Sequence, residues 1–69
     1  MNEKEQLGKI ADLLEAEEEL TAETELALLN WDSMAMLAVI ALAKTNGKTI
    51  KGSQIKEFKT VGDIIKAAF

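Results

Sequence analysis

The sequence contains no cysteine, histidine, tyrosine or arginine. Without cysteine the chain cannot form a disulfide, and the absence fits a reducing compartment. Zinc-type metal sites lose both of their preferred ligands, histidine and cysteine. Acid/base and nucleophilic catalysis rely mainly on these residue types, on tyrosine, and on lysines or paired carboxylates, and the remaining lysines and carboxylates show no such pairing. The composition therefore predicts a protein that is not an enzyme and holds no such metal.

The charge and the length of the apolar segments exclude two further classes of partner. The chain has 69 residues and a net charge of −4, and it lacks the residue best suited to phosphate and guanine contacts, so we expect no nucleic-acid binding. The longest uncharged helical stretch, residues 33–43, is about half of the ~20 residues that a membrane span requires. The polar start leads into no signal-peptide run. We expect a soluble, cytoplasmic monomer that does not bind a membrane.

Charge is divided unequally along the chain. Residues 1–32 contain ten acidic residues and two lysines, whereas residues 33–69 contain six lysines and two acidic residues. Complementary helix faces within one bundle would explain this division. The alternative explanation is an acidic surface that faces a basic partner.

Hydrophobic residues make up 48% of the chain, which is enough for a packed core in one domain. The spacing of these residues predicts main helices over residues 3–15, 33–45 and 60–68. A short helical turn is expected over 53–57, and no segment has the character of a strand. We therefore predict an all-α fold, a small four-helix bundle with three main helices and one short helix.

Local signals mark the ends of these helices. Asp32 and Ser33 precede the apolar second helix and are both strong N-caps. Asn46-Gly47 predicts the end of that helix. Thr60 followed by Asp63 is a capping pattern in which aspartate takes the place of the usual glutamate or glutamine.

A long loop is expected over residues 16–32, held to the core by Leu20, Leu26 and Leu29. Loops of this length in a compact domain are usually functional. Asn30 lies just before the second helix, and asparagine tolerates a left-handed backbone better than most residues.

The stretch W-D-S-M, residues 31–34, places one hydroxyl at the head of the most apolar helix. One interpretation is ordinary capping of the helix by Asp32 or Ser33. The other depends on the helix N-terminus, which carries a partial positive charge and unpaired N–H groups. If Asp32 is the cap, the Ser33 hydroxyl is free to carry a phosphate group at that terminus.

This stretch resembles the D-S-L or D-S-M motif of the acyl and peptidyl carrier proteins. The similarity extends in order over nearly the whole chain: residues 20–30 are similar to the first loop of that family, with Leu26 and Leu29 as apolar anchors. Ile50 resembles the apolar residue after the second helix. Phe58 and T-V-G-D-I at residues 60–64 look like the start of the last helix.

The resemblance implies a bundle of acyl-carrier-protein type, with 4′-phosphopantetheine attached to Ser33 and Asp32 as its motif partner. The thiol of that arm would carry acyl or aminoacyl groups as thioesters, in fatty acid, polyketide or nonribosomal peptide biosynthesis. Met34 is expected to be the buried apolar residue after the serine. The implied partners are a phosphopantetheinyl transferase and the enzymes that load and process the cargo. Trp31 is either a hydrophobic lid on the first loop or an exposed contact for the arm or a partner.

The second helix departs from the family, because it contains no acidic residue where relatives often present acids to partner enzymes. A helix that is apolar all round is either buried or presented to a partner. We predict that Ala35, Ala38 and Ala41 face outward and form an apolar partner face. The large side chains of this helix are then expected to supply the core side and its edges: Met34, Leu37, Val39, Ile40 and Leu42. Alternatively, the alanines reflect only their high helix propensity and partners bind elsewhere. The alternative function is an unmodified helical interaction module that uses this helix.

Overall fold

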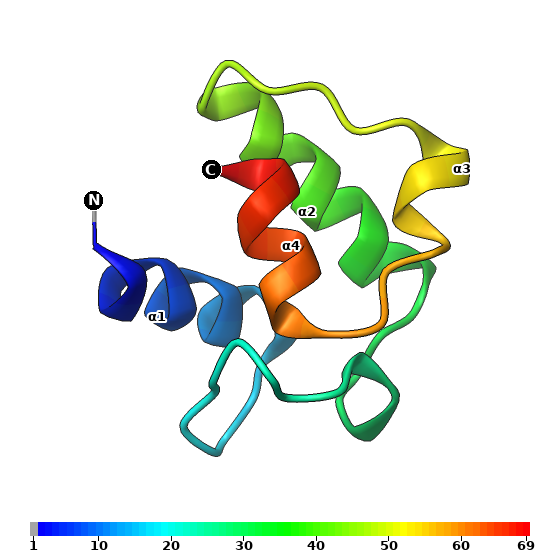
Figure 1. The fold of residues 1–69 in the computed structure, drawn as a ribbon. Coiled ribbons are helices and arrows are strands. Elements are labelled where there is room, and N and C mark those ends of the chain that lie inside the picture. The colour runs from blue at the N-terminus through cyan, green and yellow to red at the C-terminus, as the bar shows by residue number, and fades with distance from the viewer. Residues whose placement is uncertain (1) are drawn as a thin grey trace.

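Four α-helices connected by loops make up the fold (Figure 1). The computed structural model describes residues 2–69, with α1 over Glu3–Leu14, α2 over Ser33–Thr45, α3 over Gly52–Ile55 and α4 over Val61–Ala68. The described residues contain no strand, and an isolated bridge joins Glu25 to Thr60. The all-α prediction is confirmed, with three main helices and a short one.

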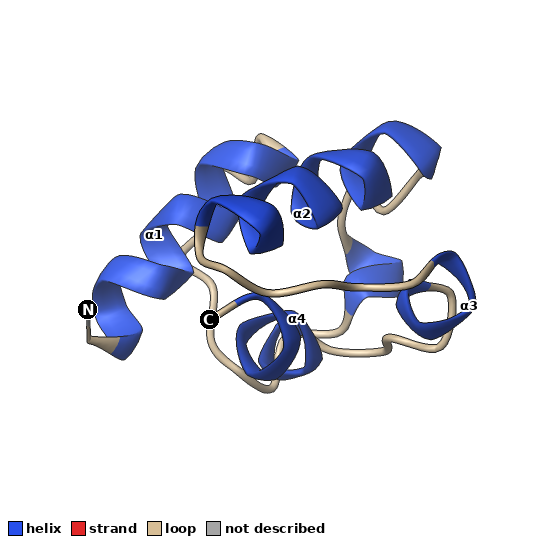
Figure 2. Cartoon of the chain, turned by 90° about the horizontal axis from the view of Figure 1, so that it is seen from above, coloured by secondary structure: helices blue, strands red, loops and turns tan. Residues whose placement is uncertain are grey.

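The helices pack around one core. α4 contacts both α1 and α2, which also contact each other. Seen from above, α1 and α2 lie on one side and α4, viewed nearly end-on, lies on the other (Figure 2). Ile10, Val39 and Ile64 have no exposed surface. The core consists of twelve buried apolar residues: Ile10, Leu14, Leu20, Leu26, Ala35, Val39, Ala43, Ile50, Ile55, Val61, Ile64 and Ala68.

Short polar side chains and left-handed residues fix the helix ends. Asn2 caps α1, because its side-chain oxygen accepts a hydrogen bond from the Glu5 backbone N–H at 2.9 Å. Glu15 ends α1 with a left-handed φ of 53°. Gly47, with φ of 74°, follows the C-cap residue Asn46 as expected for a helix stop. The Asn46 side chain also donates to the Ala68 carbonyl at 2.8 Å, which ties the end of α2 to the end of α4.

The expected capping box opens α4. The Asp63 carboxylate accepts hydrogen bonds from the backbone N–H groups of Lys59, at 2.9 Å, and Thr60, at 3.2 Å. These two bonds, helped by the positive charge of Lys66, lower the pKa of Asp63 against a smaller opposing effect of burial. The charged form of Asp63 therefore stabilises the start of the helix.

Apolar side chains attach the long loop between α1 and α2 to the core. Leu20 and Leu26 are buried and Leu29 is half-buried, as predicted. A 3-10 turn over Leu26–Leu28, which the sequence pattern did not indicate, forms the middle of the loop. Asn30 does not adopt a left-handed backbone: Glu15 is the one non-glycine residue with positive φ among the described residues.

Backbone hydrogen bonds join this loop to the start of α4. The Leu26 N–H donates to the Lys59 carbonyl at 2.8 Å, and the Val61 N–H donates to the Thr24 carbonyl at 2.9 Å. The Gly62 N–H donates to the Ala22 carbonyl at 2.8 Å. A β-carbon on residue 62 would lie 2.9 Å from that same carbonyl oxygen, so glycine permits this close approach. The loop that leads to α2 is thereby fixed to the last helix.

Candidate functional site

At the start of α2, the residue that caps the helix is Asp32 and not Ser33. Asp32 is the N-cap, with an extended backbone, and its side-chain oxygen accepts from the Ala35 N–H at 2.9 Å. Its carbonyl accepts from the Met36 N–H at 3.0 Å. Ser33 is then the first residue of the helix. Of the two possible caps that the sequence offered, the structure uses the aspartate.

Ser33 is exposed, and its hydroxyl makes no hydrogen bond with any described residue. The N–H groups of Ser33 and Met34 belong to the first helical turn, where no carbonyl of the same helix can accept from them. These donors and the positive end of the helix dipole favour a negative group at this place. A phosphate ester on Ser33 would be accessible and electrostatically favourable.

The predicted orientation of α2 is wrong in part, although Val39 is buried as expected. Met34 and Leu37, which were expected on the core side or at its edges, are 79% and 65% exposed. Ala35, which was expected to face outward, is buried together with Val39 and Ala43. The remaining members are divided: Ala41 is exposed as predicted, whereas Ala38, Ile40 and Leu42 are half-buried.

This rotation has a physical reason in the size of the side chains. Ala35 and Ala43 occupy the face that meets the other helices, and small side chains let helix backbones approach closely. The larger Met34 and Leu37 are consequently left on the outer face, next to Ser33 along the helix. The surface beside Ser33 is therefore apolar, but large side chains form it rather than alanines.

Trp31 lies on the other side of the capping residue. Its ring is half-buried and packs against the core, as expected for a hydrophobic lid. It lines a shallow hollow of about 330 Å³ together with Leu26 and Phe58. Packing against the core thus fixes the Trp31 side chain. Trp31 is partly exposed and lies two residues before Ser33 in the sequence.

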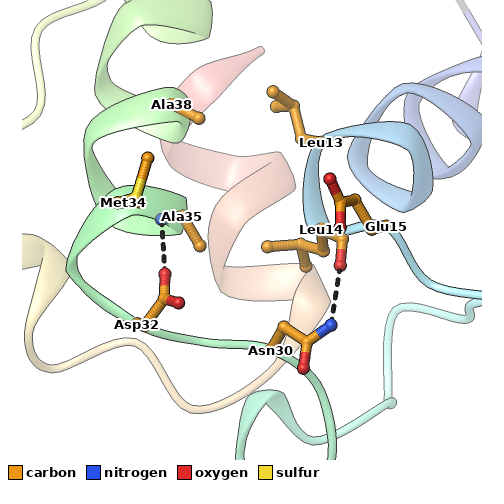
Figure 3. A pocket seen from close by; sticks show the side chains of 8 residues that line it. All are labelled: Leu13, Leu14, Glu15, Asn30, Asp32, Met34, Ala35 and Ala38. Carbon is orange, nitrogen blue, oxygen red and sulfur yellow. Dashed lines mark hydrogen bonds between the residues drawn. The ribbon is translucent and has the colours of Figure 1, made fainter.

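A groove lies between the end of α1 and the start of α2 (Figure 3). Its volume is about 300 Å³, and five apolar residues line most of it: Leu13, Leu14, Met34, Ala35 and Ala38. Polar groups from Glu15, Asn30 and Asp32 complete the lining. The Asn30 side chain donates to the Leu14 carbonyl at 3.5 Å and so crosses from the loop to α1. The sequence pattern gave no sign of this groove, because it forms only when the two helices pack together.

A second hollow of about 310 Å³ adjoins the groove. The two share Leu14, Glu15 and Asn30, and the second hollow adds the carboxylates of Glu17 and Glu18. Its lining also includes Leu28, Leu29 and Ala16. The groove and the hollow together form one surface in which apolar and polar groups are mixed and the charged residues are all acidic.

In comparisons with known proteins, no family model, no curated protein and no solved structure matches the chain. Within residues 2–69, none of the helices combines the length and the apolar character that crossing a membrane requires.

Proposed function

We propose that the protein is an acyl carrier protein that holds acyl or aminoacyl groups as thioesters on a 4′-phosphopantetheine arm attached to Ser33. The observation that supports this proposal is the free, exposed Ser33 hydroxyl on the first residue of α2, beside a separate cap residue. The W-D-S-M motif and the resemblance along the chain give the same assignment. The proposal includes a cytoplasmic location and a monomeric carrier that meets its enzymes transiently.

The residues at the head of α2 fit the arm. Ser33 would hold it through a phosphodiester, and the first-turn N–H groups would face the negative phosphate. Asp32 keeps the helix start in place through its bond to Ala35. When bound, the arm supplies a terminal thiol for thioester formation. The chain contains no cysteine, so no thiol of the protein would compete for the cargo.

Attachment requires coenzyme A and a phosphopantetheinyl transferase. The Ser33 oxygen forms a bond to the phosphorus on the pantetheine side of the coenzyme A pyrophosphate, and the bond to the leaving 3′,5′-ADP breaks. The serine proton passes to a base on the transferase, since no described side chain is hydrogen-bonded to the Ser33 hydroxyl. The protein thus contributes the nucleophilic oxygen and its presentation.

Intact-mass measurement after incubation with coenzyme A and a transferase tests the proposal. We expect the mass of one phosphopantetheine on the wild type and none on Ser33→Ala. Ser53→Ala is a matched control, because Ser53 is the only other serine and is also exposed in the first turn of a helix, α3. Modification of Ser33→Ala, or loss of modification in Ser53→Ala alone, would contradict the assignment.

A second candidate function is an unmodified interaction module. The exposure of Met34 and Leu37, at 79% and 65%, favours it, because large apolar side chains on an outer helix face mark binding surfaces. The same mass spectrum separates the two candidates: a module of this kind stays unmodified with every transferase tested. Binding of its partner would also be unaffected by Ser33→Ala.

A further inference from the structure

The groove between α1 and α2 has the size and lining of a site for one large apolar side chain. Leu13 and Leu14 of α1 form one wall, and Ala35 and Ala38 of α2 lie opposite them (Figure 3). Because two alanines lie where larger residues could fill the space, the groove stays open to about 300 Å³. This is the lower end of the ~300–1,000 Å³ range of ligand pockets.

The charge around the groove has one sign. Glu15 and Asp32 contribute carboxylates to its lining, and Glu17 and Glu18 contribute two more to the adjoining hollow. No lysine lines either depression. An occupant with basic groups beside its apolar part would be complementary to this surface, and an acidic occupant would be repelled.

Exposed apolar side chains border the same two depressions. Leu28, Met34 and Leu37 are the large apolar residues that the described part of the chain leaves exposed. Met34 lines the groove and Leu28 lines the adjoining hollow. A flexible methionine at the edge of a groove can adapt to the shape of an inserted side chain. Apolar surface, open volume and acidic charge therefore coincide at one place.

We propose that this groove binds a segment of a partner protein that inserts one large apolar side chain, flanked by lysine or arginine, between α1 and α2. The apolar side chain would occupy the space beside Ala38, and the basic groups would reach the carboxylates of Glu15 and Asp32. Burial of the apolar group supplies most of the affinity, whereas the charges orient the segment and reject acidic partners. The groove belongs to the unmodified chain, so this inference is independent of the attachment at Ser33.

Nuclear magnetic resonance titration of the unmodified, isotope-labelled protein tests the inference with three capped peptides. The first is acetyl-Lys-Phe-Lys-amide, and the others are acetyl-Glu-Phe-Glu-amide and acetyl-Lys-Ala-Lys-amide. We expect the first peptide alone to shift the backbone amides of Leu14, Ala35 and Ala38 in a saturable way. Equal effects of the alanine peptide or of the acidic peptide would overturn the proposal, and so would shifts confined to Leu37 and Ala41.

Two pairs of variants locate the site. Ala38→Leu fills the groove with apolar atoms and should abolish binding, whereas Ala41→Leu adds the same atoms at an exposed position outside the groove and should not. Glu15→Gln should weaken binding about two- to fivefold, as for an exposed ion pair, while Glu3→Gln at the far end of α1 should leave it unchanged.

Each variant is compared with the wild type by circular dichroism, so that loss of binding is read only from folded protein. If Ala38→Leu unfolds the chain, Ala38→Val gives the same steric test with a smaller side chain. Wild-type affinity in the folded groove-filling variant, or equal losses in Glu15→Gln and Glu3→Gln, would show that the segment binds elsewhere.

Discussion

Replacing Asp32 with alanine should lower the free energy of unfolding by about 1–2 kcal/mol. The structure gives two contributions: the bond from the Ala35 N–H to the carboxylate, at 2.9 Å, and the favourable position of a negative charge at a helix N-terminus. Loss of an N-cap costs about 0.5–2 kcal/mol, and loss of the charge about 0.3–1 kcal/mol. In a domain of this size the melting temperature falls by about 4–8 °C for each kcal/mol.

Two further variants separate these contributions. Asp32→Asn keeps an acceptor for the Ala35 N–H and removes the charge, so it should cost only the electrostatic part, about 0.3–1 kcal/mol. Asn2→Ala removes the neutral cap of α1, which makes the equivalent bond to Glu5 at 2.9 Å. The decrease in the free energy of unfolding of this variant measures what a cap contributes in this fold when no side-chain charge is lost.

Urea unfolding at neutral pH, followed by far-ultraviolet circular dichroism, provides the free energies, and the initial rate of phosphopantetheine transfer provides a functional measure. We expect the order wild type, Asp32→Asn, Asp32→Ala for stability, and slower transfer to Asp32→Ala. Equal stability of the wild type and Asp32→Ala would refute the capping role. Equal costs of the asparagine and alanine variants would refute the division between hydrogen bond and charge.

The start of α4 and the core give three further predictions. Asp63 has a lowered pKa, so its contribution is present above the unfolded-state pKa of about 3.9 and is lost as the pH falls through the lower folded-state value. The stability difference between wild type and Asp63→Asn should therefore shrink in acid, and a difference that is constant with pH would exclude this linkage. Gly62→Ala should destabilise the fold because its β-carbon meets the Ala22 carbonyl oxygen at 2.9 Å, whereas Gly8→Ala, with nothing within 4 Å, should stabilise α1 by about 0.5–1 kcal/mol; thermal melts that rank the two variants the other way would contradict this. Ile64→Ala removes a side chain with no exposed surface and should cost about 2–5 kcal/mol in urea unfolding, and a loss below 1 kcal/mol would mean that the site collapses around the smaller residue.

Helix ends could be predicted from the sequence because capping is a local interaction. Asp32, Thr60 and Asp63 each act within three or four residues along the chain, and their hydrogen bonds are those expected of N-caps. The exposed position of Ser33 follows from the same local geometry. The part of the candidate site that depends on the start of α2 could therefore be predicted from the sequence.

The rotation of α2 about its own axis, which decides which side chains face the core, could not be predicted in the same way. No charged residue occurs in this helix before Lys44, so its hydrophobic pattern gives little contrast between an inner and an outer face. Packing decides the rotation instead, and the small Ala35 turns inward while Met34 turns out. The groove beside Ala38 likewise depends on how α1 meets α2, which no pattern within either helix contains.

The hydrogen bonds between the long loop and the start of α4 make the two segments one cooperative unit. The amide hydrogens of Leu26, Val61 and Gly62 each bridge from one segment to the other, so they should exchange with solvent together rather than one by one. A proteolytic cut on the N-terminal side of Lys59, which releases this residue together with α4, would remove the acceptor or the donor of every one of these bonds. The loop would then lose these attachments, and the position of Ser33 relative to α1 would depend on the direct packing of α1 against α2 and on the bond from Asn30 to the Leu14 carbonyl. The start of the last helix thus helps to determine how the serine near the middle of the chain is displayed.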